Sequence, residues 1–191
     1  MRLFTAIELP EDVRQHLAAI ARQWRAIDDE LGGRISWVPP QNYHVTLKFF
    51  GEVADTEVAG LCEALKAIAP VGPAKIRAEA VECFPPRRSL RVAAFGLGGD
   101  VGNLVRLNQA IEIAAEPRGF ARERRPFRAH ITVARSKVPL RPSARDRLER
   151  TAAGLLPGPE FAAREFVVMQ SILTQSGAEY VPVGRVPLGE V

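Results

Sequence analysis

Two four-residue segments of the same kind constrain this chain most: His44-Val45-Thr46-Leu47 and His130-Ile131-Thr132-Val133. Each lies in an alternating run typical of a β-strand, where side chains two positions apart point to the same face. The histidine and threonine of each segment therefore share one face, and the two apolar residues share the other. If the apolar residues face a core, two such strands side by side present two imidazoles and two hydroxyls together. These groups are suited to acid–base catalysis at a phosphate, with one histidine as base and the other as acid.

A purely structural role and a metal site are the alternatives to this interpretation. A single His-x-Thr-x segment is ordinary, because a neighbouring threonine can satisfy a half-buried histidine. The repetition favours a functional role, since the chain has three histidines and two of them occupy these segments. The third, His16, lies beside the apolar stripe of a predicted helix, and we expect it at the surface. Threonine is a poor zinc ligand and no His-Glu-x-x-His segment occurs, so we expect no metal.

The bulk composition is that of a globular protein. The chain has 191 residues, 47% hydrophobic and 25% charged, enough for one large domain or two lobes sharing a core. Its net charge is +4, carried mainly by arginine, which favours bidentate contacts with phosphate. The two cysteines do not form a disulfide framework, and no segment resembles a signal peptide or membrane span. These features predict a cytoplasmic protein with no membrane partner.

The pattern of elements repeats along the chain as strand, helix, motif strand, helix and strands. Apolar spacing predicts helices over 10–31, 58–68, 104–114 and 143–153, the first with a stripe formed by Val13, Leu17, Ile20, Trp24 and Ile27. Alternation predicts strands at 2–8, 35–38, 43–50, 74–84, 89–97, 161–170, 171–175 and 180–186, besides one that ends near 135. Turns are expected at Pro70 and at Pro85-Pro86-Arg87-Arg88. The repetition suggests an ancient duplication, with two lobes facing each other.

Three residues near the motifs are further candidates. Arg135 lies five positions after His130, on the opposite face of a regular strand, but a bend near Ala134 would turn it toward the site. Of Phe49 and Phe50, we expect one in the core and the other free to stack on a base. Tyr180 has the same two interpretations.

The chain resembles the 2H phosphoesterase superfamily, and most closely its bacterial and archaeal RNA 2′,3′-cyclic phosphodiesterases, also called 2′-5′ RNA ligases. The resemblance lies in the segments 1–10, 37–51, 125–135, 170–171 and 177–180. Ala129 stands where the family commonly has proline, and the segment 91–95 lacks a tryptophan often found there. The resemblance implies an α+β fold: a single domain, 1–191, of two pseudo-symmetric lobes. Each lobe would contribute one motif, with two antiparallel sheets lining a central cleft and helices outside.

The resemblance also implies a function: hydrolysis of RNA 2′,3′-cyclic phosphate ends to a 2′-phosphate, without metal or other cofactor. The resemblance also implies a possible secondary activity, reverse ligation, which joins RNA ends through a 2′-5′ bond. By analogy, His130 would be the base and His44 the acid. The substrate-binding residues would be Thr46, Thr132, Arg135, Phe49 and Tyr180. We expect a monomer that acts on RNA ends or nucleotides with a cyclic phosphate, tRNA fragments included.

Two alternatives stay open at this point. One is a 2H phosphodiesterase for a small cyclic nucleotide phosphate, such as one made from ADP-ribose. The other is a non-catalytic module that binds a nucleotide or RNA. The basic segments Arg118–Arg125 and Arg87-Arg88 favour a polyanion over a small substrate.

Overall fold

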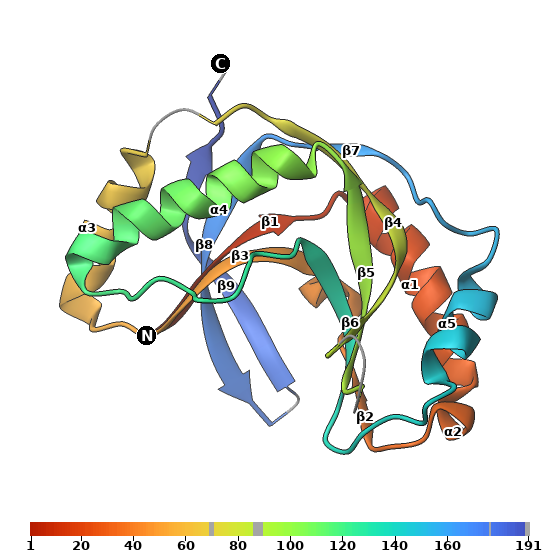
Figure 1. The fold of residues 1–191 in the computed structure, drawn as a ribbon. Coiled ribbons are helices and arrows are strands. Elements are labelled where there is room, and N and C mark those ends of the chain that lie inside the picture. Colours follow the sequence, from red (N-terminus) through yellow and green to blue (C-terminus); the bar gives the residue numbers. More distant parts are fainter. Residues whose placement is uncertain (69–70, 86–89, 176, 190–191) are drawn as a thin grey trace.

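The computed structural model describes residues 1–68, 71–85, 90–175 and 177–189, and its strands form one curled antiparallel sheet (Figure 1). The elements in chain order are β1 (Arg2–Glu8), α1 (Glu11–Ala26), α2 (Asp28–Leu31), β2 (Ile35–Trp37), η1 (Pro40–Asn42), β3 (His44–Glu52), α3 (Asp55–Lys66), β4 (Ala74–Phe84), β5 (Val92–Gly99), α4 (Val101–Ala115), η2 (Glu116–Arg118), β6 (His130–Ser136), α5 (Ala144–Ala152), β7 (Phe161–Ala163), β8 (Glu165–Thr174) and β9 (Gly177–Pro187). The turns expected at Pro70 and at 86–88 lie outside the described residues.

The strand order is β7-β4-β5-β6-β3-β1-β8-β9, with β2 beside β6. The order is symmetric about the junction of the two motif strands, β6 and β3. Each motif strand lies beside the strand that precedes it in its repeat, β1 for β3 and β5 for β6. The next strands change sides: β4 pairs with β5, and β8 pairs with β1. The α+β class and antiparallel pairing are confirmed, but the spatial halves are not the successive halves of the chain.

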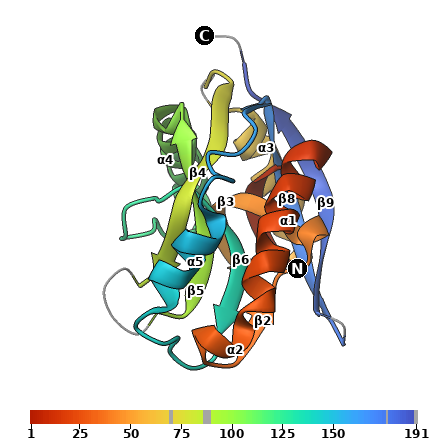
Figure 2. The same cartoon turned by 90° about the vertical axis from the view of Figure 1, so that its right-hand side faces the viewer.

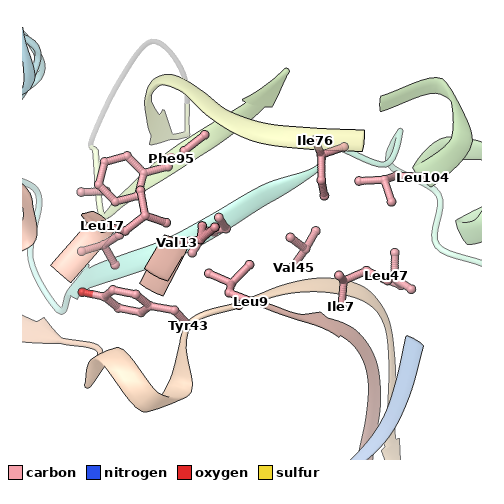
Figure 3. Close-up of a cluster of buried hydrophobic side chains, with 14 of the residues drawn as sticks. Ile7, Leu9, Val13, Leu17, Tyr43, Val45, Leu47, Ile76, Phe95 and Leu104 are labelled. Atoms are coloured by element: carbon pink, nitrogen blue, oxygen red, sulfur yellow. The ribbon is translucent and has the colours of Figure 1, made fainter. Parts of the chain in front are cut away.

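The junction between the halves is narrow. Strands β3 and β6 pair only at Val45 and Ile131, so the two expected sheets are joined into one. Both residues are fully buried and belong to a core cluster that contains residues of both halves. Figure 3 shows Val45 in the same cluster as Val13 and Leu17 of α1 and Phe95 of β5. The shared core fixes the two motif strands relative to each other.

Helix α1 covers the core as its apolar stripe predicts. Glu11 and Asp12 occupy its first turn, where acidic side chains stabilise the positive end of a helix. Trp24 is completely buried, stacks on Phe95 at 4.7 Å between ring centroids, and donates its Nε1–H to the carbonyl of Leu148 at 3.1 Å. Trp24 thus ties α1 to β5 and to α5, which packs beside α1 (Figure 2).

Three predicted strand boundaries were wrong. The predicted strand 161–170 is interrupted at Arg164, because β7 pairs with β4 in one half and β8 pairs with β1 in the other. No break occurs at Gln170, since β8 continues to Thr174 beside β9. Strand β5 likewise runs through Gly96 to Gly99.

The glycines of β5 have a packing role. A Cβ at Gly96 or Gly98 would overlap the side chain of Glu82 or Glu79 on the neighbouring strand β4. The glycines therefore make room for two carboxylates of the neighbouring strand. None of the described helices is long and apolar enough to cross a membrane.

Candidate functional site

The two motif segments lie at the junction of β3 and β6, with their histidines and threonines on one face of the sheet. We call the face that carries His44 and His130 the site face. Both histidines and both threonines are half-buried, whereas the alternating apolar residues are buried in the core. The period-two prediction is therefore correct at both segments, since the apolar residues do face a core.

A β-bulge follows the threonine in each motif strand and changes which face the next residues occupy. In β6 the bulge lies at Val133, because Ala94 pairs with Thr132 and Ala93 pairs with Ala134. Val92 then pairs with Arg135, and Val92 lies on the same face of β5 as Ala94. Arg135 therefore shares the site face with Thr132. This irregularity is the bend that the sequence required for Arg135 to reach the site.

The bulge in β3 is at the matching position, Leu47. Thr5 pairs with Lys48 and Ala6 with Thr46, so Leu47 has no counterpart in β1 at this bulge. As a result Phe49, opposite Phe4, shares the site face with Thr46. Phe49 is 63% exposed. Phe50 instead packs against the core, with its ring 5.2 Å from that of Phe120.

His44 is held by two hydrogen bonds. Its Nδ1 lies 2.8 Å from the carbonyl oxygen of Asn42, and its Nε2 lies 2.9 Å from Oγ1 of Thr46. A carbonyl only accepts, so Nδ1 carries the proton, and Nε2 is the basic nitrogen of the neutral ring. Burial lowers the pKa of His44, and the positive charges of Arg135 and His130 lower it further, against the raising effect of the Asn42 carbonyl. The pairing of Val45 with Ile131 brings the segments of His44 and His130 side by side.

His130 repeats this arrangement in the other half. Its Nδ1 donates to the carbonyl oxygen of Arg128, 2.7 Å away, again two residues upstream. Among the described residues, its Nε2 has no hydrogen-bond partner. The imidazole is thus held in the tautomer that leaves Nε2 available to a substrate or water.

Three residues around His130 were missed by sequence reasoning. The ring of Phe84 lies 4.8 Å from that of His130, and the Arg128 guanidinium lies over Phe84 at 5.2 Å. Glu82 accepts a bond from Arg128 at 3.2 Å. The alternation of β4 carried a signal, because buried Cys83 separates Glu82 from Phe84. The sequence did not show which strand would lie beside the second motif.

Aromatic rings surround His44 on the site face. Phe4 lies 5.0 Å from both His44 and Tyr180, and Tyr180 meets His44 edge-on at 5.3 Å. Phe49 extends this group, 5.7 Å from Phe4. Phe4 was also missed by sequence reasoning. It lies on β1, the strand that pairs with β3, four residues before Glu8, which pairs with His44. The structure therefore places Tyr180 beside His44, and it connects Phe49 to His44 only through Phe4.

The basic loop between η2 and β6 has exposed arginines, several of them paired with carboxylates. Arg122 bonds Glu116 at 2.7 Å, and Arg125 bonds Glu123 at 3.4 Å. The other predicted basic pair, Arg87-Arg88, lies outside the described residues. Within the described ranges, no three His, Cys, Asp or Glu side chains are grouped as ligands for a metal ion.

Comparisons with known proteins agree with this architecture. A family model described as LigT-like phosphoesterase matches residues 7–94 and 100–180. The RNA 2′,3′-cyclic phosphodiesterase of Archaeoglobus fulgidus is 32% identical over 180 residues, covering 94% of this chain and 96% of that protein. The Methanocaldococcus jannaschii protein of the same name is 30% identical over 181 residues, covering 94% of this chain and 96% of that protein. The crystal structure of E. coli LigT complexed with 3′-AMP superposes with a TM-score of 0.74 at 26% identity, covering 99% of this chain and 98% of that one. By sequence and by structure, this chain belongs to the LigT-like phosphoesterase family.

Proposed function

We propose that this protein hydrolyses the 2′,3′-cyclic phosphate at RNA ends to a 2′-phosphate. The observation that carries the proposal is the pairing of two histidines with two threonines at one strand junction, joined on the same face by Arg135. The names of the curated relatives support the substrate class. The geometry supports the roles of the residues, and the relatives support an RNA 2′,3′-cyclic phosphate as the substrate.

In the proposed reaction, water attacks phosphorus and the bond from phosphorus to the 3′ oxygen breaks. One histidine removes the proton from water, and the other protonates the departing 3′ oxygen. Thr46 and Thr132 donate hydrogen bonds to the non-bridging oxygens, whose negative charge increases in the transition state. Arg135 adds a positive charge there. Two histidines supply both proton transfers, so the mechanism requires no metal ion.

We assign His130 as the base and His44 as the acid. The Nε2 of His130 is free of hydrogen bonds to the described residues and can accept one from the attacking water. The lowered pKa of His44 makes its protonated form a stronger acid. A bound phosphate offsets the positive charge of Arg135, so we expect His44 to take up a proton when substrate binds.

Substitution of the two histidines tests the proposal. Each acid or base typically contributes about 10²–10⁴-fold in rate, so His44→Ala and His130→Ala should nearly abolish turnover of a cyclic phosphate. Thr46→Ala should leave measurable activity, because Thr132 and Arg135 still contact the phosphate. Wild-type rates in both histidine variants would overturn the proposal, provided that circular dichroism shows both to be folded.

A substrate with sulfur in place of the bridging 3′ oxygen tests the order of acid and base. A thiolate leaves without protonation, so this substrate bypasses the acid but still needs the base. We expect it to restore activity to His44→Ala and not to His130→Ala. Rescue of His130→Ala alone would reverse the assignment.

A further inference from the structure

Strands β8 and β9 continue as a hairpin past the point where the sheet supports them. β8 pairs with β1 only over Val167–Gln170, and its last residues, 171–174, pair with β9 alone. Figure 1 shows the two strands running on together beyond β1 and β3. Tyr180 lies on this part of the hairpin, opposite Ser171. Within the sheet, the main chain at Tyr180 is therefore held by β8 alone.

Asn42 adds a hydrogen bond from outside the sheet. Its side-chain Nδ2 donates to the carbonyl oxygen of Ala178 at 2.7 Å, a contact between residues 136 positions apart in the chain. Ala178 lies two residues before Tyr180 on β9, the last strand in the sheet order. The amide of Asn42 thus fastens the main chain of an edge strand that has a strand neighbour on one side only.

The main chain of Asn42 also holds the His44 ring. Its carbonyl oxygen accepts the Nδ1–H of His44 at 2.8 Å. The residue itself is fixed, because the 3₁₀ turn η1 is closed by bonds from Asn42 to Pro39 and from Tyr43 to Pro40, and Tyr43 is buried. One residue on a rigid turn therefore contacts both the histidine and the hairpin.

The rings of Phe4, His44 and Tyr180 pack against one another and connect the two contacts of Asn42, one to His44 and one to the hairpin. Tyr180 meets His44 edge-on, and Phe4 touches both rings at 5.0 Å. Release of the hairpin would move Tyr180 away from His44 and loosen one side of the imidazole. The carbonyl of Asn42 would still hold Nδ1, so the histidine would keep its tautomer and lose its lateral packing.

We propose that Asn42 is a positioning residue for the reaction: its side-chain amide clamps the β8–β9 hairpin so that Tyr180 packs against His44. The inference rests on the proposed function, because it holds that the clamp contributes to turnover of the cyclic phosphate. The net contribution of one neutral hydrogen bond corresponds to about a fivefold change in an equilibrium or rate. Disruption of the clamp should therefore reduce activity moderately, unlike removal of a histidine.

The test is a double-mutant cycle on kcat/KM with an RNA 2′,3′-cyclic phosphate. Asn42→Asp keeps the size of the side chain but replaces the donor with a carboxylate that repels the Ala178 carbonyl. We expect about a five- to tenfold loss in kcat/KM. In a Tyr180→Ala background the same substitution should cost less than about twofold, because the clamp acts through Tyr180.

Gln41→Glu is the matched control, since it makes the same amide-to-acid change at the exposed neighbouring position of the same turn. We expect it to retain wild-type kcat/KM. Equal losses for Asn42→Asp in both backgrounds would show that Asn42 does not act through Tyr180 and would overturn the inference. Wild-type activity of Asn42→Asp would do the same. Failure of the proposed function is distinguishable, because either the wild-type protein would then not open the cyclic phosphate, or His44→Ala and His130→Ala would retain activity.

Discussion

Each catalytic candidate is oriented by a main-chain carbonyl two residues upstream, Asn42 for His44 and Arg128 for His130. A main-chain acceptor is present whatever the side chain, so the tautomer of each imidazole is set by the backbone entering the strand. The surroundings differ, since burial and nearby positive charge lower the pKa of His44. The two motifs are alike in sequence, but their histidines lie in different surroundings.

Arg135→Gln should raise the pKa of His44, because it removes one of the positive charges that lower it. The pH dependence of kcat/KM in the variant should shift toward higher pH in the limb that reports His44. The measurement is a full pH–rate profile of the two proteins. Arg150→Gln, an exposed change on α5, is the control and should leave the profile in place. An unshifted limb in Arg135→Gln would contradict the electrostatic coupling.

The lowered pKa of His44 also predicts how stability depends on pH. Below the ordinary histidine value of 6.5, the unfolded chain binds a proton at His44 that the folded protein resists. The free energy of unfolding should therefore decrease as the pH drops through 6.5. Above 6.5, His44 should no longer make the free energy of unfolding depend on pH. Urea unfolding at about pH 7.5 and about pH 5.5 would measure the loss. His44→Gln should lose less stability between these values than the wild type does, and an equal loss would refute the prediction.

At the scale of elements, periodicity predicted the helices and most strands but not the bulges. A regular strand would put Phe49 and Arg135 on the core side, and the bulge residues that precede them, Leu47 and Val133, move them to the site face. A bulge depends on the register between two strands, which no single strand encodes. For the same reason Phe84 and Phe4 were missed, since their neighbours come from other parts of the chain.

The bulge in β3 also buries Lys48, whose ammonium bonds Glu112 of α4 at 2.5 Å and the Ala121 carbonyl at 2.9 Å. Lys48→Met should destabilise the protein by about 3–5 kcal/mol, because Glu112 is left buried without its partner. Chemical denaturation measures the difference. The double variant Lys48→Met, Glu112→Met should recover most of it, since no charge is then stranded. A double variant no more stable than the single one would show that packing, not charge, dominates here.

At the scale of the molecule, the repeat of strand, helix and motif strand is visible in the sequence, whereas the exchange of β4 and β8 between the halves is not. Strand pairing over long sequence separations is decided by the shared core. We propose that the symmetric strand order reflects an internal duplication in which each repeat contributes one His-x-Thr-x motif. The site then belongs to neither repeat alone.

If RNA is the substrate, its affinity should depend on salt more steeply for an oligoribonucleotide than for a mononucleotide, because a longer chain makes more phosphate contacts. Arg122→Gln in the basic loop should reduce the slope for the oligonucleotide by about one if it contacts a phosphate. Arg150→Gln serves as the charge-matched control. Binding measurements over a range of salt concentrations test this, and equal slopes for the two ligands would favour a small cyclic substrate.

The most direct measurement is incubation of the protein, in EDTA, with an oligoribonucleotide that ends in a 2′,3′-cyclic phosphate, followed by mapping of the product phosphate. We expect a 2′-phosphate, formed without any divalent ion, because two histidines carry both proton transfers. A 3′-phosphate product would contradict the proposed bond cleavage. Activity that is lost in EDTA and restored by a divalent ion would contradict the two-histidine mechanism.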